Sequence, residues 1–99
     1  MYCALWEFRV RPGSEAAFES AYGADGDWAR LFRRDPAWVR TELLRDRSEP
    51  GRYLTADFWE DAAAFDSFRQ HFGADYEAVD RRCEAFTLSE RKLGEFDAG

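Results

Sequence analysis

His71 is the only histidine in the sequence, so it is the only side chain whose unperturbed pKa lies near neutrality. Such a group could act as a general base that takes a proton from a substrate. A structural role is the alternative, because His71 precedes Gly73 near an expected helix C-terminus, where positive charge is favourable. No carboxylate at a fixed spacing decides between the two interpretations.

Asp57 is the second candidate for acid or base chemistry. It stands between Thr55 and Trp59, and a carboxylate in such a segment must be hydrogen-bonded, paired with arginine or raised in pKa. Arg40, on the preceding expected strand, is a possible partner. A salt bridge at a sheet edge and an acid in a pocket are therefore both open.

The segment around Asp57, residues 53–60, alternates like a strand that separates two environments. Leu54, Ala56 and Phe58 form an apolar face, because successive strand side chains point to opposite sides. The opposite face carries aromatic and polar groups, namely Tyr53, Thr55, Asp57 and Trp59. Such a face suits a ligand pocket or a subunit contact. The rings of Trp59 and Tyr53 could stack on a flat aromatic ligand, or they could fill the core.

The two cysteines do not indicate a metal site or a nucleophile. Cys3 and Cys83 fall on different expected elements without the spacing of metal ligands, which is typical of reduced thiols. The single histidine also argues against an imidazole-based metal site. We therefore expect no metal.

Hydrophobic periodicity and turn residues predict one domain over residues 1–99. Alternation predicts strands at 2–10, 37–46, 53–60 and 87–96, the last of them weakly paired toward Phe96, with frayed residues after it. Helical spacing predicts a first helix broken into two pieces over 14–34 and a second helical region over 60–86 that Gly73 interrupts. The order β-α-β-β-α-β is that of the ferredoxin-like α+β fold, in which a four-stranded antiparallel sheet carries its helices on one face.

One-sided helix cover predicts a second partner for the sheet. The uncovered face must meet water, a ligand or another sheet, and we expect some of Tyr53, Trp59 and Trp38 to lie there. In a chain of 99 residues, 45% hydrophobic and 17% aromatic content also favours self-association over a monomer. We therefore expect a homodimer in which two sheets pack together.

Charge and hydropathy exclude several classes of partner. A net charge of −6 argues against nucleic acid, whose phosphates require clustered lysine and arginine. No run approaches the ~18 apolar residues that a membrane span requires. The N-terminus lacks a basic region followed by an apolar stretch and a cleavage site, so a cytoplasmic location is expected.

Several segments together resemble the antibiotic biosynthesis monooxygenase-like family of the dimeric α+β barrel superfamily. The resemblance is carried by Val10-Arg11-Pro12-Gly13, Phe18, Trp28-Ala29-Arg30-Leu31-Phe32, Glu42-Leu43-Leu44-Arg45-Asp46, Tyr53 to Trp59, and Phe65. It implies a homodimer with a shared β-barrel and one pocket per subunit between sheet and helices. The family includes monooxygenases that act on quinols or polyketide aromatics without a cofactor, and enzymes that degrade haem.

Residue by residue, the resemblance gives a mixed result. Trp59 occupies the position of the family's pocket tryptophan. The branch that acts on polyketides has an asparagine four residues earlier and a tyrosine six residues later, where this chain has Thr55 and Phe65. The expected binding residues are therefore Trp59, Tyr53, Thr55 and Phe65, with His71 or Asp57 as the catalytic base and no cofactor. The departures at Thr55 and Phe65 favour the alternative of a small-ligand-binding or accessory dimer without turnover.

Haem binding is the weaker alternative. The haem-degrading branch has a ligating histidine near the end of its second long helix, and an approximate alignment places Asp80 there. A carboxylate is a poor replacement for imidazole on haem iron.

Overall fold

Four strands form one antiparallel sheet in the order β2-β3-β1-β4 in the computed structural model, which describes residues 1–99. The strands are β1 (Tyr2–Val10), β2 (Trp38–Arg45), β3 (Arg52–Trp59) and β4 (Thr87–Asp97). This order makes β3 and β1 the central strands. Every neighbouring pair is antiparallel. The predicted ferredoxin-like α+β fold is confirmed.

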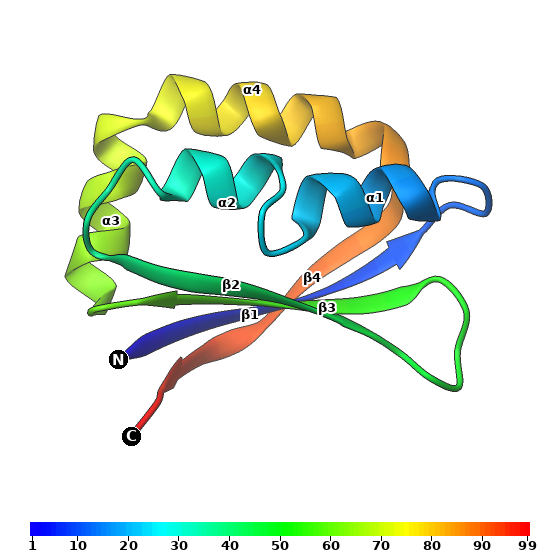
Figure 1. Cartoon of the computed structure of the whole chain (residues 1–99), viewed down its shortest axis with the longest axis horizontal. Coiled ribbons are helices and arrows are strands. Elements are labelled where there is room, and N and C mark those ends of the chain that lie inside the picture. The colour runs from blue at the N-terminus through cyan, green and yellow to red at the C-terminus, as the bar shows by residue number, and fades with distance from the viewer.

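The helices all lie on one side of the sheet (Figure 1). They are α1 (Glu15–Tyr22), α2 (Asp27–Phe32), α3 (Ala62–His71) and α4 (Gly73–Cys83), followed by the short 3-10 helix η1 (Glu84–Phe86). Both expected breaks are present, one between α1 and α2 and one between α3 and α4. The Asp61 carboxylate accepts a 2.8 Å hydrogen bond from the Ala64 amide and so begins α3, because the first amides of a helix lack intrahelical partners.

The hydrophobic core lies between the sheet and the helices and is mainly aromatic. Phe18, Trp59 and Phe68 have no exposed surface. The ring centroid of Trp59 lies 5.4 Å from that of Phe32 and 5.1 Å from that of Phe68, so the end of β3 is joined to both helical regions. Tilted and edge-on contacts of this kind are the favoured arrangement of buried rings.

The expectation that Tyr53, Trp59 or Trp38 lies on the uncovered face is wrong. Tyr53 and Trp59 are buried beneath the helices, and Trp38 packs against the same core. The physical reason is area: with Trp6 and Phe8 of β1 on the same side, the face of Tyr53 and Trp59 presents more aromatic surface to the helices than the face of Leu54, Ala56 and Phe58 does. Alternation separates two faces, but it does not say which of them the helices cover.

The uncovered face combines an apolar region with a charged end. Leu5, Leu54 and Phe58 are half-buried there, and two large side chains are strongly exposed, Leu44 by 48% and Phe96 by 50%. At one end, charged groups neutralise each other through bonds from the Arg52 guanidinium to Glu7, at 2.7 Å, and to Asp46, at 3.0 Å. The apolar part has no such partner within the chain.

The end of β4 differs from the prediction. β4 pairs with β1 as far as Asp97, opposite Tyr2, and the Ala98 amide donates a 2.7 Å hydrogen bond to the Met1 carbonyl. Phe96 lies opposite Cys3 in this ladder, so the strand does not fray there. A register shift beside Leu5 accommodates Gly94, whose φ of 159° departs from regular strand geometry.

None of the four helices combines the length and the apolar character that crossing a membrane would need.

Replacing Trp59 with alanine should lower the free energy of unfolding by about 3 to 5 kcal/mol, the usual cost of a large cavity in a core. Urea denaturation followed by circular dichroism measures this. The control is Trp59→Phe, which should lose much less, because the Trp59 indole N–H has no hydrogen-bond partner to lose. An unchanged unfolding midpoint for Trp59→Ala would contradict its place in the core.

Candidate functional site

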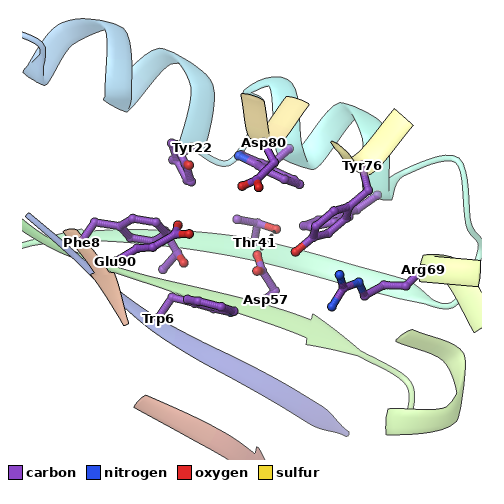
Figure 2. Close-up of a pocket in the computed structure, with 12 residues that line it drawn as sticks. Trp6, Phe8, Tyr22, Thr41, Asp57, Arg69, Tyr76, Asp80 and Glu90 are labelled. Carbon is purple, nitrogen blue, oxygen red and sulfur yellow. Dashed lines mark hydrogen bonds between the residues drawn. The ribbon is translucent and has the colours of Figure 1, made fainter. Parts of the chain in front are cut away.

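A cavity of about 210 Å³ lies between the sheet and the helix layer (Figure 2). Its walls are six aromatic rings, those of Trp6, Phe8, Tyr22, Trp28, Phe32 and Tyr76. Its polar lining is Thr41, Thr55, Asp57, Arg69, Asp80 and Glu90. An apolar cavity of about 150 Å³ holds a benzene-sized molecule, so this one has room for an aromatic ring with a substituent.

Short side chains on the sheet open this space. Thr55 and Asp57 stand on β3 between the large rings of Tyr53 and Trp59, and Thr41 lies beside Asp57 on β2. These three side chains reach less far toward the helices than the rings that flank them. The same row of β3 therefore supplies core at both ends and the wall of a cavity in between.

Asp57 is a half-buried carboxylate that lines the cavity. One of its oxygens, Oδ1, accepts a 2.9 Å hydrogen bond from the Thr41 hydroxyl. Burial raises the pKa of Asp57 to about 6, and the bond from Thr41 opposes that rise. The other oxygen, Oδ2, has no hydrogen-bond partner in the chain and is not enclosed. Because Asp57 lines the cavity, that oxygen is available to a ligand, and near neutral pH the carboxylate is mostly ionised and able to accept a proton.

A second hydrogen bond fixes the direction of the first. The Trp38 indole N–H donates to Thr41 Oγ1 at 3.2 Å. An indole N–H can only donate, so Thr41 Oγ1 must accept from it and keeps its own hydrogen for Asp57. Thr41 is therefore a fixed donor that stabilises the charged form of Asp57.

The predicted salt bridge between Arg40 and Asp57 is absent. Arg40 precedes Thr41 on β2 and points to the other face of the sheet. Its guanidinium lies 4.0 Å from the ring centroid of Phe58 and donates a 2.8 Å hydrogen bond to Glu42. The carboxyl group of Asp57 thus has a neutral partner in place of a cation.

Two of the six predicted site residues, Thr55 and Asp57, line the cavity. His71 does not: it is exposed at the end of α3, outside the cavity lining. Phe68 and Phe72 direct one side of that segment toward the core, where their rings stack. His71 immediately precedes Phe72 in the sequence, so its side chain points away from the core and into solvent.

The other three predicted residues belong to the core around the cavity. Trp59 is fully buried, and Phe65 packs on it at a centroid distance of 5.4 Å. Tyr53 packs against Phe18, and its hydroxyl donates a hydrogen bond to Glu19. None of the three lines the cavity.

Strand register could have revealed two lining residues that sequence reasoning missed. Trp6 is paired with Thr55, and Thr41 with Asp57, so both point to the same side as their partners. A shift of one residue in the pairing of β2 with β3 would place the opposite face of β2 beside Asp57, so the choice of Thr41 depends on the observed register. Arg69, Tyr76, Asp80 and Glu90 reach the cavity only through the packing of helices and strands far apart in the sequence.

No group of three or more histidine, cysteine, aspartate or glutamate side chains is arranged to hold a metal ion.

The fold and the cavity together define a class: a small ferredoxin-like α+β protein with an aromatic pocket between sheet and helices. A sequence profile described as "Antibiotic biosynthesis monooxygenase" matches residues 1–79. The chain therefore belongs to the antibiotic biosynthesis monooxygenase family, whose fold is that of the dimeric α+β barrels.

Solved structures of the same fold support this assignment. A variant of SnoaB, described as a cofactor-independent oxygenase from Streptomyces nogalater, is 27% identical, with 98% of this chain and 91% of that chain covered and a TM-score of 0.80. A Bordetella bronchiseptica protein assigned to the same family is 23% identical, with 99% and 96% covered and a TM-score of 0.74. A Deinococcus radiodurans protein with that assignment is 14% identical, with 100% and 93% covered and a TM-score of 0.76. The last two show the fold alone.

The comparison with curated proteins finds no match.

Replacing Asp57 with asparagine should stabilise the protein at pH 8 relative to the wild type. A carboxyl group whose pKa rises from 3.8 to about 6 on folding favours the folded state below pH 4, and that contribution is lost as the pH rises through 6. A rise of about two pH units corresponds to roughly 3 kcal/mol.

The measurement is the difference in unfolding free energy between variant and wild type at pH 4 and at pH 8. Arg52 lowers the pKa of Glu7, and the Ser48 amide together with Arg52 lowers that of Asp46. Both groups act in the opposite direction but equally in the two proteins, so they cancel in the difference. A difference that does not change with pH would contradict the buried, raised-pKa state of Asp57.

Proposed function

We propose that this protein is a cofactor-independent monooxygenase that acts on an electron-rich aromatic molecule, such as a quinol or an anthrone, with Asp57 as the general base. The observation that carries the proposal is a half-buried carboxylate with a raised pKa inside a cavity walled by aromatic rings. Its free oxygen faces the space that a ligand would fill, and its pKa of about 6 suits proton abstraction near neutrality. Membership of the family, and the oxygenase description of SnoaB, support the proposal.

The chemistry begins with Asp57 Oδ2 accepting a proton from the substrate's hydroxyl or activated methylene group. The resulting anion gives an electron to oxygen more readily than the neutral molecule does. For a methylene group between two rings, four electrons pass from carbon to dioxygen. One oxygen atom becomes the new carbonyl and the other leaves as water, which carries both hydrogen atoms, the first of them by way of Asp57. The substrate supplies every electron, so the step needs no cofactor.

The surrounding side chains assist without forming bonds to the substrate. The aromatic walls exclude water, which strengthens the electrostatic interactions of Asp57. Arg69 lines the same cavity, where its positive charge favours an anionic intermediate. Thr41 holds the carboxylate in one orientation through the bond that Trp38 directs.

A binding or accessory role without turnover is the second candidate. The residues that the family resemblance pairs with polyketide chemistry are replaced by Thr55 and Phe65, and Phe65 lies outside the cavity. Haem binding has less support still, because no histidine lines a cavity of about 210 Å³.

Oxygen uptake with a panel of quinols and anthrones tests the proposal. Asp57→Asn should lower the rate at least about 100-fold, because general-base catalysis contributes about 10² to 10⁴. Thr41→Val removes the donor to Asp57 and should move the acidic limb of the pH profile to higher pH, whereas Thr41→Ser should not. His71→Ala is the matched control and should keep the wild-type rate.

Full activity of Asp57→Asn would refute the role of Asp57. No uptake with any member of the panel, together with tight binding of one of them, would favour the accessory role.

The same proposal includes a homodimer formed through the uncovered sheet face. Exposed Leu44 and Phe96 together with half-buried Leu5, Leu54 and Phe58 give that face the apolar character that association removes from water. The two cysteines are free and buried, which fits the reducing cytoplasm that we propose as the location.

Light scattering at micromolar concentration should report about twice 11.5 kDa. Leu54→Glu places a charge within the apolar face and should shift the mass toward the monomer, since a buried unpaired charge is costly. Ala78→Glu adds the same charge at an exposed position of α4 and should leave the dimer intact. A monomeric wild type would contradict the dimer while leaving the cavity within each chain unchanged.

A further inference from the structure

The charged groups of the cavity are arranged unevenly. Arg69 approaches from α3 on one side, and Glu90 lies on the other side beside Phe8. Asp80, from the helix layer, and Asp57, from the sheet, lie between them (Figure 2). Glu90 and Asp80 also line a smaller adjoining space of about 110 Å³. The cavity therefore has a cationic end and an anionic end.

The cavity carboxylates lack the partners that carboxylates elsewhere in the chain possess. On α4, Asp75 is bonded to Arg34 at 3.1 Å and Glu77 lies 3.9 Å from Arg81, whereas no ion pair involves Asp80. Arg82, two residues after Asp80, is directed to Asp27 instead. The two arginines that follow Asp80 are thus engaged elsewhere.

Glu90 and Asp57 are likewise without cations. No ion pair or hydrogen bond involves the side chain of Glu90, which is an exposed residue at the edge of the cavity. Partial desolvation and then repulsion from Asp80 and Glu84 raise its pKa. Asp57 has only the neutral Thr41 hydroxyl as a partner and keeps one oxygen free toward the cavity. Three carboxylates therefore line one aromatic space without forming an ion pair, and Arg69 is the only cation of that lining.

Aromatic walls add to this preference for positive charge. The face of a tryptophan or tyrosine ring is electron-rich and attracts an ammonium group within about 6 Å. Trp6, Tyr22 and Trp28 supply such rings around the carboxylates, whereas the ring of Tyr76 already has the Arg69 guanidinium 4.5 Å from its centroid. Aromatic rings combined with unpaired carboxylates form the chemical environment that recognises organic cations.

From this arrangement we infer that the cavity selects an aromatic ligand that carries a protonated amine. The amine lies between Asp80 and Glu90, and the hydroxyl-bearing ring extends toward Asp57 and Arg69. The position of the hydroxyl group rests on the proposed function, whereas the selection of the amine requires no turnover. A volume of about 210 Å³ accommodates one ring with a short side chain.

Three probes of matched shape test the inference: 4-(2-aminoethyl)phenol, 4-propylphenol and 3-(4-hydroxyphenyl)propanoate. They share the phenol ring and the side-chain length, and differ in carrying a positive charge, no charge or a negative charge at its end. Dissociation constants are measured at pH 7 and physiological salt from the quenching of tryptophan fluorescence. We expect the amine to bind at least about tenfold more tightly than the carboxylate, with the neutral probe between them, because charge-assisted contacts in a partly desolvated site are strong.

Amide variants locate the origin of the preference. The double variant Asp80→Asn with Glu90→Gln should reduce the ratio between amine and carboxylate probes to within about threefold of unity. Glu77→Gln, on the same helix but outside the cavity, removes a charge from the surface and should leave the ratio unchanged. Arg69→Gln should increase the ratio, since it removes the one cation of the lining.

Equal or tighter binding of the carboxylate probe by the wild type would overturn the inference, and this outcome decides the matter even where a variant fails to fold. An unchanged ratio in the folded double variant would also overturn it, because the preference would then come from the net charge of −6. Failure of the proposed function is a different result: the amine probe binds with the expected ratio, but no phenol or quinol consumes oxygen.

Discussion

The structure depends on the packing of one aromatic face of a four-stranded sheet against a single layer of helices. Phe18, Trp59 and Phe68 lose all their exposed surface in that contact. Burial of large rings is the main favourable free energy available to a domain of 99 residues, which has little interior to spare. A gap in this packing forms the cavity and holds the Asp57 carboxylate. The restriction of the helices to one side leaves the other sheet face uncovered.

The cavity is the place where this packing is interrupted. On the covered face of β3, Thr55 and Asp57 stand between the rings of Tyr53 and Trp59. The space above these two shorter side chains is not filled by helix side chains and forms the cavity. An ionisable group in such a place is costly, since burial opposes its charged form. Only one neutral hydrogen bond, from Thr41, offsets this cost at Asp57. Ionisable groups with a perturbed pKa in a cleft are typical of functional sites.

The one-sided helix layer also connects the cavity with association. Because Tyr53 and Trp59 of β3 are used for the core, the alternate row of the same strand, with Leu54 and Phe58, remains on the uncovered face. The cavity and the apolar face thus lie on opposite sides of the same strand. A second copy on the apolar face would hold β3 in place from behind without contributing to the internal packing of the cavity.

The order of strands and helices was determined by the sequence alone, because alternation, helical spacing and turn residues are local properties. The separation of Leu54 and Ala56 from Tyr53 and Asp57 follows from the same alternation. Tertiary structure decided which of these faces the helices cover, since that depends on the total apolar area presented to α1–α4. It also decided that Asp57 meets Thr41 and not Arg40, because a shift of one residue in hairpin register exchanges the two. Placing Arg69, Asp80 and Glu90 around one cavity required contacts between distant segments, which no local pattern encodes.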